Sequence, residues 1–261
     1  MLLKSKIPYL KTINLRGNRL GVITEFEPSY GAIEVLILKD CKIIMVEPGT
    51  FKSLENMIRL DLSNNSISRL DESVFGEDSK LELLQLPDNS LTSVSGTFNR
   101  TRLLKELKLT SNQINNITDA FKGLTILRKI SLSRNLVTHI PDDAFSDNSE
   151  LVEINLSENK IRWVGTNALK GLVTLRWLLL QGNKLLSLNG SLRHLPKIQH
   201  LDASFNAIQS LEWGEFANNG RLTSIEANGE QHQQPARSIH RSWRNGVAQP
   251  RKEPGASAAA K

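Results

Sequence analysis

The residues that could support catalysis are few and scattered along this chain of 261 residues. Its five histidines have no carboxylate at the spacing of a metal site. They are His139, His194, His200, His232 and His240. The phosphate-binding patterns G-x-x-x-x-G-K-[ST] and G-x-G-x-x-G are absent, as are H-E-x-x-H and G-x-S-x-G. The sequence therefore predicts no enzyme, no cofactor and no bound metal.

Composition and charge exclude further classes of protein. No apolar run reaches the length of a membrane span, and the first residues lack the apolar core of a signal peptide. The single cysteine, Cys41, excludes an internal disulfide framework. The formal charge is +6, but six basic and two acidic residues fall in 229–261, so the body carries only +2. This low charge density predicts no nucleic-acid partner and no membrane contact within this segment.

A repeat positions the remaining residues. Nine units of the pattern L-x-x-L-x-L-x-x-N-x-L follow one another between Leu10 and Ile208, and their first positions lie 23 or 24 residues apart. The alternating x-L-x-L-x stretch has the period of a strand, and such short strands bury enough surface only when they stack on their neighbours. We therefore expect one strand per coil in a continuous parallel ladder.

The asparagine of each unit is expected to form a polar ladder inside the turn. Its side chain can bond the backbone groups that are left free where the chain leaves the strand. The residues at this position are Asn18, Cys41, Asn65, Asn89, Asn112, Asn135, Asn159, Asn183 and Asn206. Cys41 occupies the position in the second unit, which favours a structural thiol over a nucleophile.

A phenylalanine column is predicted on the return side of the coils. Six residues before most units stands a phenylalanine, and leucine fills the position in the others. The residues are Phe51, Phe75, Phe98, Phe121, Phe145, Leu169, Leu192 and Phe216, with Phe26 displaced by one. We expect these side chains to pack as one column.

Over residues 7–227 the repeats resemble the leucine-rich-repeat family, in its typical class of 23–24 residues. The F-x-x-L element, as in Phe51-Lys52-Ser53-Leu54, is similar to that of Toll-like receptor ectodomains, Slit-like and chaoptin-like adhesion proteins and small matrix proteoglycans. The resemblance implies an α/β fold: a right-handed horseshoe solenoid with a parallel β-sheet on its concave face. It also implies non-catalytic recognition of a protein or other ligand, most often through that face.

Two segments are expected. Residues 1–228 form the solenoid, with about nine full repeats, partial repeats at both ends and none of the cysteine-containing caps of extracellular relatives. Residues 229–261 form a basic tail of low complexity that we expect to be disordered. The missing caps favour a fragment of a longer protein, and a naturally capless protein is the alternative.

The candidate binding residues lie on the expected concave face. Trp177 and Leu179 adjoin in the eighth unit, His200 stands on the next coil, and Phe205 follows at a turn. Exposed aromatic residues among polar ones are typical of binding hot spots. Lys108 and Lys129 belong to a basic patch that could meet an acidic partner, but Glu106 and Glu153 dilute it, which favours an ordinary solvated face.

Five N-x-[ST] acceptors would carry glycans in a secreted protein: Asn64, Asn99, Asn116, Asn155 and Asn189. Asn155 falls on the concave sheet, where a glycan would block the middle of the face.

Three functions remain open. The first is a recognition module of an extracellular or cell-surface receptor or innate-immune protein, which binds a protein ligand or co-receptor and could form homo- or heterodimers. The second is a cell-adhesion or matrix scaffold, and the third is a cytoplasmic regulator or inhibitor. The F-x-x-L element favours the first two, whereas the missing export signal favours the third.

Overall fold

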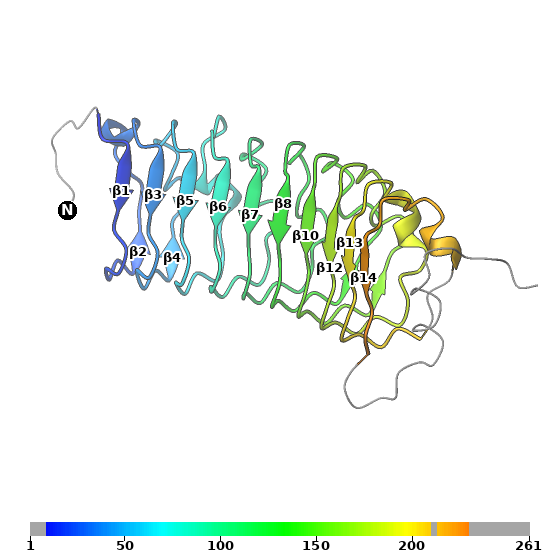
Figure 1. Ribbon diagram of the computed structural model, residues 1–261. Coiled ribbons are helices and arrows are strands. Elements are labelled where there is room, and N and C mark those ends of the chain that lie inside the picture. Colours follow the sequence, from blue (N-terminus) through cyan, green and yellow to red (C-terminus); the bar gives the residue numbers. More distant parts are fainter. Residues whose placement is uncertain (1–8, 210–212, 230–261) are drawn as a thin grey trace, which may run out of the picture.

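One short strand from each coil joins a single parallel sheet in chain order (Figure 1). The computed structural model describes residues 9–209 and 213–229, and within them the sheet has ten strands. These are β1 (Thr12–Asn14), β3 (Val35–Ile37), β5 (Arg59–Asp61), β6 (Leu83–Gln85), β7 (Glu106–Lys108), β8 (Lys129–Ser131), β10 (Glu153–Asn155), β12 (Trp177–Leu179), β13 (His200–Asp202) and β14 (Ser224–Glu226). The predicted strand ladder is confirmed. The predicted tail, except for Gly229, lies outside the described residues.

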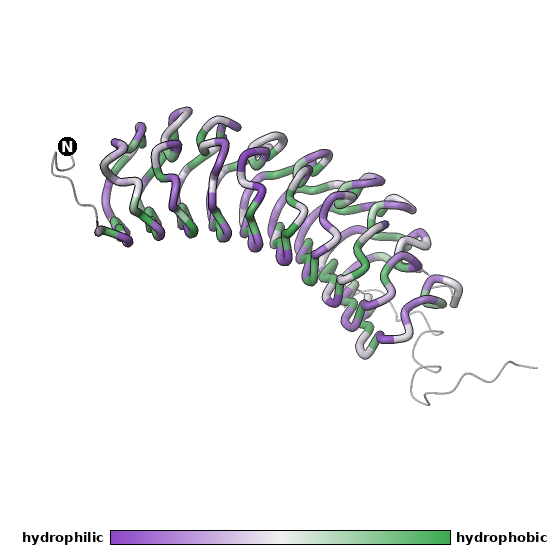
Figure 2. The backbone as a smooth tube through the Cα atoms, turned by 90° about the horizontal axis from the view of Figure 1, so that it is seen from above, coloured by the Kyte–Doolittle hydropathy of each residue, from purple (hydrophilic) through white to green (hydrophobic). Residues whose placement is uncertain are grey.

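The register of the sheet repeats without a slip. Glu153 pairs with Trp177, which pairs with His200, and every other strand pair follows the same rule. Because equivalent positions of successive units become neighbours, each position of the repeat forms a column across the sheet. The coils follow an arc when they are seen from above (Figure 2), with the sheet along the inner side. Strands lie about 4.8 Å apart, closer than the bulkier return segments can pack, so the sheet side is the shorter one.

The return side of the coils contains only short elements. Two pairs of two-residue strands follow the turns after the main strands: β2 (Val22–Ile23) with β4 (Met45–Val46), and β9 (His139–Ile140) with β11 (Trp163–Val164). The helical part of the predicted α/β solenoid consists of 3-10 turns within the described residues. They are η1 (Pro28–Tyr30), η2 (Glu72–Val74), η3 (Ser191–His194) and η4 (Trp213–Phe216).

The core is a continuous filling of leucine, isoleucine and phenylalanine between the sheet and the return side. Repeat leucines such as Leu107 and Leu156 are fully buried. The phenylalanines stack in two runs, Phe26–Phe51–Phe75 and Phe121–Phe145, with ring centroids 5.7 to 6.1 Å apart, and Phe98 is buried between the two runs. Each ring thereby fills the space that the short return segments leave.

The asparagines of the repeat join each coil to the coil before it. The Nδ2 of Asn135 donates to the carbonyl oxygens of Leu132, in its own turn, and of Leu109, in the preceding coil, at 3.0 and 2.9 Å. Its Oδ1 accepts from the backbone N–H of Ile114 at 3.0 Å. These backbone groups are buried away from water, where an unpaired one would cost about 1–3 kcal/mol. The asparagine column therefore satisfies the turns while it fixes their stacking.

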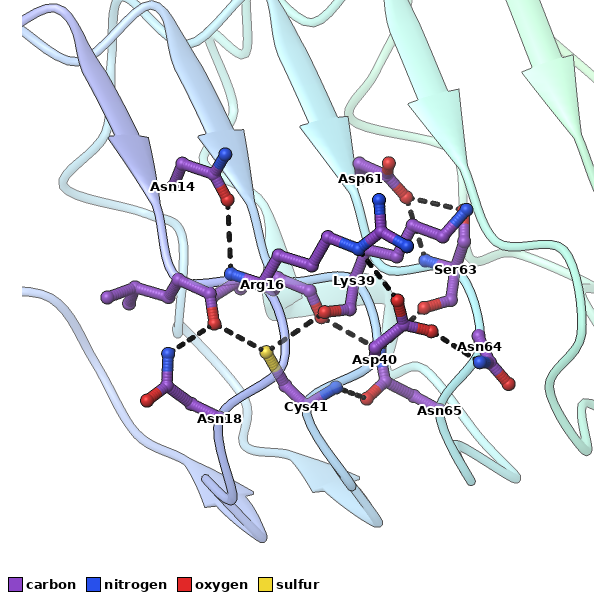
Figure 3. Close-up of polar contacts among 12 residues, drawn as sticks. Asn14, Arg16, Asn18, Lys39, Asp40, Cys41, Asp61, Ser63, Asn64 and Asn65 are labelled. Carbon is purple, nitrogen blue, oxygen red and sulfur yellow. Dashed lines mark hydrogen bonds and ion pairs between the residues drawn. The ribbon is translucent and has the colours of Figure 1, made fainter.

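Cys41 replaces the hydrogen-bond donor of the ladder asparagine but not its acceptor. Its Sγ lies 3.0 Å from the carbonyl oxygen of Leu15 and 3.3 Å from that of Lys39, so its single S–H can donate to one of the two carbonyls that an amide would reach together. Figure 3 shows it between Asn18 and Asn65 of the neighbouring coils. A thiol is a poor acceptor. The backbone N–H of Leu20 instead donates to the carbonyl oxygen of Cys41, at 2.9 Å.

Truncation of a central phenylalanine should leave a cavity that the neighbouring coils cannot close. We expect Phe121→Ala to lower the free energy of unfolding by about 3–5 kcal/mol in a urea titration followed by circular dichroism. Val173→Ala, at a half-exposed side chain, is the control and should change it by no more than about 0.5 kcal/mol. A loss below about 1 kcal/mol for Phe121→Ala would contradict the packed column.

Removal of a ladder asparagine should leave buried carbonyl and amide groups unpaired. We expect Asn135→Ala to cost about 2–3 kcal/mol in the same titration. Cys41→Ala should cost less than half as much, because the Leu20 amide has a partner that does not depend on the Cys41 side chain. An equal loss of unfolding free energy in the two variants would show that the Oδ1 acceptor of the asparagine contributes little to stability.

Candidate binding surface

Three columns of side chains cover the concave side of the sheet, and most of them are polar. The strand residues on either side of each buried leucine are half-buried or exposed, as with Glu106 and Lys108 around Leu107. Ion pairs connect many of the charged groups. The pairs between neighbouring coils are Lys11–Glu34, Arg16–Asp40, Lys105–Glu82, Lys129–Glu153 and Arg134–Glu158, at 2.6 to 3.5 Å. Exposed pairs of this kind add little stability, but they cancel the local charge.

The two lysines predicted as binding residues both take part in ion pairs. The Nζ of Lys108 lies 3.0 Å from a carboxylate oxygen of Glu106, and that of Lys129 lies 3.5 Å from Glu153. The middle of the concave face is therefore an alternation of opposite charges. A partner that binds there must replace these internal pairs with contacts of its own.

An aromatic stack marks the C-terminal part of the face. Trp177 of β12 and His200 of β13 occupy the same column, and their rings lie nearly parallel, with centroids 3.7 Å apart and planes inclined by 13°. The indole remains 41% exposed. The histidine packs on one face of the indole and Glu153 is the column neighbour on the other side, so the pair forms a partly exposed aromatic surface that needs little ordering on binding.

The other two predicted residues of this region lie apart from the stack. Leu179 is half-buried on the same strand, in the column of Asn155 and Asp202. Phe205 lies in the turn after β13, is 49% exposed, and forms no ring contact with Trp177 or His200. Trp177, Leu179 and His200 therefore face the same side of the sheet, and Phe205 lies in the turn beyond β13.

The backbone of Phe205 is in the left-handed region. Its φ is 53°, and the same position is also left-handed in other coils, with φ of 52° at Asn64, 54° at Glu158 and 67° at Gly182. Glycine or a small polar residue adopts this conformation at low cost, whereas a bulky aromatic residue is strained there. The repeat imposes this left-handed turn in most coils, and Phe205 is the bulkiest residue at the position.

Asp40 is held ionised near the N-terminal end of the face. The amide of Asn64 donates a hydrogen bond to its carboxylate, and the Nε of Arg16 lies 2.8 Å away (Figure 3). These contacts hold the pKa of Asp40 below its usual value, the Asn64 hydrogen bond most of all. The stabilisation is present above the pKa of an unfolded aspartate and is lost as the pH falls through the lower folded value.

The five glycosylation acceptors differ in their accessibility. Asn64, Asn99, Asn116 and Asn189 are exposed, whereas Asn155 is half-buried in β10. The Oδ1 of Asn155 also accepts hydrogen bonds from the backbone N–H and the hydroxyl of Ser157, at 3.0 and 2.6 Å. Asn155 is therefore the least accessible of the five.

A second aromatic stack, which the sequence columns of the concave face do not include, lies on the flank after the turns. Trp163 of β11 stacks on His139 of β9, with centroids 4.9 Å apart and planes inclined by 17°. The stack borders a hollow of about 420 Å³ that is lined by Thr138, His139, Lys160, Arg162, Trp163 and Lys184. We call these six residues the flank hollow. An alignment of the residues that follow each ladder asparagine would have shown that these six residues lie in neighbouring columns.

The described residues contain no group of three or more histidine, cysteine, aspartate and glutamate side chains that could hold a metal ion. No helix among them is long and apolar enough to cross a membrane.

Comparison with known families gives a match to the leucine-rich repeat over residues 32–91, 79–137 and 125–185. These overlapping segments together cover more than half of the chain. A curated relative, the human CD180 antigen, is 38% identical over 66 residues, which are 24% of this chain and 10% of that protein. The chain thus spans about a tenth of the length of this relative.

Solved structures with a similar fold come from several sources. The crystal structure of a TLR13–ssRNA13 complex has a TM-score of 0.70 and 26% identity, over 81% of this chain and 31% of that one. The leucine-rich repeat domain of APL1B has a TM-score of 0.69 and 24% identity, over 84% and 64% of the two chains. Internalin C2 from Listeria monocytogenes has a TM-score of 0.61 and 22% identity, over 83% of this chain and 80% of that one. The last two show the fold alone.

Proposed function

Because the chain belongs to the leucine-rich-repeat family, we propose that it is a non-catalytic recognition module that binds a protein ligand through the concave face. We place it in an extracellular receptor or immune-recognition protein. The likeness to the CD180 antigen and to TLR13 supports this context, and so do the four exposed glycosylation acceptors.

The observation that carries the proposal is the Trp177–His200 stack. A tryptophan that has a rigid support, is partly exposed and is surrounded by polar residues is the usual anchor of a protein interface. Leu179 extends the apolar surface along β12, and Phe205 adds an exposed ring at the edge. Protein interfaces concentrate their binding energy in such clusters, while the surrounding ion pairs exclude water and set the orientation.

Charge favours a protein over a nucleic acid on this face. The TLR13 structure is a complex with RNA, and RNA binding requires a surplus of cations along the bound strand. In this chain the three concave columns contain nearly equal numbers of cationic and acidic residues, and Glu153 and Asp202 lie beside Trp177 and Leu179. We therefore assign the concave face to a protein ligand.

Loss of the Trp177 surface should abolish recognition while the solenoid stays folded. We expect a screen of the purified chain against a panel of extracellular proteins to yield a partner. Trp177→Ala combined with Leu179→Ala should weaken its binding at least about tenfold by surface plasmon resonance.

The matched control is Trp163→Ala, which removes a tryptophan of similar exposure from the flank and should leave the affinity for this partner unchanged. Circular dichroism of each variant establishes that the fold survives. Unchanged binding by the folded double variant would contradict the proposed site. Equally tight binding of a single-stranded RNA oligonucleotide would contradict a protein ligand.

Glycosylation tests the extracellular context. We expect that the chain, secreted from animal cells behind a supplied signal peptide, carries glycans on exposed acceptors such as Asn64 and Asn116, with Asn155 the least occupied. Peptide mass spectrometry before and after enzymatic deglycosylation measures the occupancy. Five bare acceptors would contradict the extracellular assignment.

A further inference from the structure

We propose that the flank hollow binds a nucleoside diphosphate, with the base on the Trp163–His139 stack and the phosphates on the surrounding cations. This site lies after the ladder turns, away from the concave columns, and its ligand is distinct from the protein partner proposed above.

Three cations of the hollow have no acidic partner. Where a column brings opposite charges together, as with Lys105 and Glu82 or Arg134 and Glu158, the cation has an acidic partner in a neighbouring coil. Lys160, Arg162 and Lys184 have none. The column of Lys160 contains Leu136 and Lys184, and that of Arg162 contains Thr138 and Leu186. Adjacent like charges repel one another, and a bound anion would relieve that repulsion.

A flat aromatic surface lies beside these charges. The indole of Trp163 is 49% exposed and rests on the imidazole of His139, whose Nδ1 lies 3.0 Å from the hydroxyl of Thr138. This hydrogen bond orients the imidazole and thereby the indole. Exposed, pre-oriented rings of this kind stack on nucleobases, and lysine and arginine beside them bind phosphate.

The two Trp–His stacks of the chain differ in their electrostatics. Trp177 on the concave face has Glu153 as its other column neighbour, whereas Trp163 has a lysine or arginine on each side of the hollow. The same pair of rings is therefore placed once beside carboxylates and once beside cations only. An anionic aromatic ligand fits the second arrangement and is repelled by the first.

The size and charge of the hollow select among such ligands. Its volume of about 420 Å³ is in the range of small-molecule sites. The three cations match the charge of about −3 on a nucleoside diphosphate better than the single charge of a sulfated tyrosine. Inorganic phosphate, or an acidic peptide without an aromatic ring, would make no contact with the ring stack.

Calorimetric titration of the whole chain with ADP at low salt tests the assignment. We expect ADP to bind one site, with adenosine and pyrophosphate each at least about tenfold weaker, because each has only half of the contacts. Trp163→Ala should weaken ADP binding at least about tenfold, and so should Lys160→Gln combined with Lys184→Gln. The double lysine variant should also reduce the salt dependence of binding.

The matched control is Trp177→Ala, which removes the stack beside the carboxylates and should leave ADP binding unchanged. Circular dichroism confirms that each variant is folded. The assignment is wrong if ADP at about 1 mM produces no binding, or if Trp163→Ala and Trp177→Ala have the same effect. It is equally wrong if pyrophosphate or hexaglutamate binds as tightly as ADP, because the hollow would then recognise charge alone.

Discussion

The satisfaction of buried backbone groups by the next coil is the constraint on which the whole molecule depends. A strand of three residues cannot exist alone, and the turn after it would bury unpaired amides and carbonyls. The ladder asparagine pairs with its own turn and with the preceding coil at once, as Asn135 does. The stacking of one coil on the next therefore also forms the hydrogen bonds of its turn. A coil length of 23 or 24 residues is what keeps the asparagines in line.

Strict register converts a repeated sequence into surfaces. Each repeat position becomes a column, so residues that are 23 or 24 apart in the sequence are neighbours on the surface. A ring stack or an ion pair can form wherever two successive units carry complementary side chains at the same position. Both Trp–His stacks arise in this way, Trp177 on His200 and Trp163 on His139. Their positions in the repeat place one on the concave sheet and the other on the flank. The scaffold is common to all coils, whereas specificity comes from the few columns in which one coil departs from its neighbours.

Most of the fold could be predicted from the sequence, because the repeat specifies the strand, the turn and the packed side at once. The adjacency of Trp177, Leu179 and His200 followed from the same columns. The return side was less predictable: its 3-10 turns have no repeated pattern, and Asn148, in place of the usual leucine, donates to the carbonyl oxygens of Phe121 and Leu124. The position of Phe205 and the flank hollow depend on turn geometry beyond the ladder, which the period alone does not describe. The binding residues themselves remain a proposal.

Hydroxyl-radical footprinting of the chain with its bound protein partner, read by mass spectrometry, shows directly whether the concave face is the binding surface. Tryptophan and phenylalanine are oxidised readily when they are exposed, and the chain presents such rings on both sides. The account predicts that the partner protects Trp177 and Phe205 while Trp163 is oxidised as in the free chain. Protection confined to Trp163 or to the convex side, with Trp177 still oxidised, would contradict recognition through the concave face.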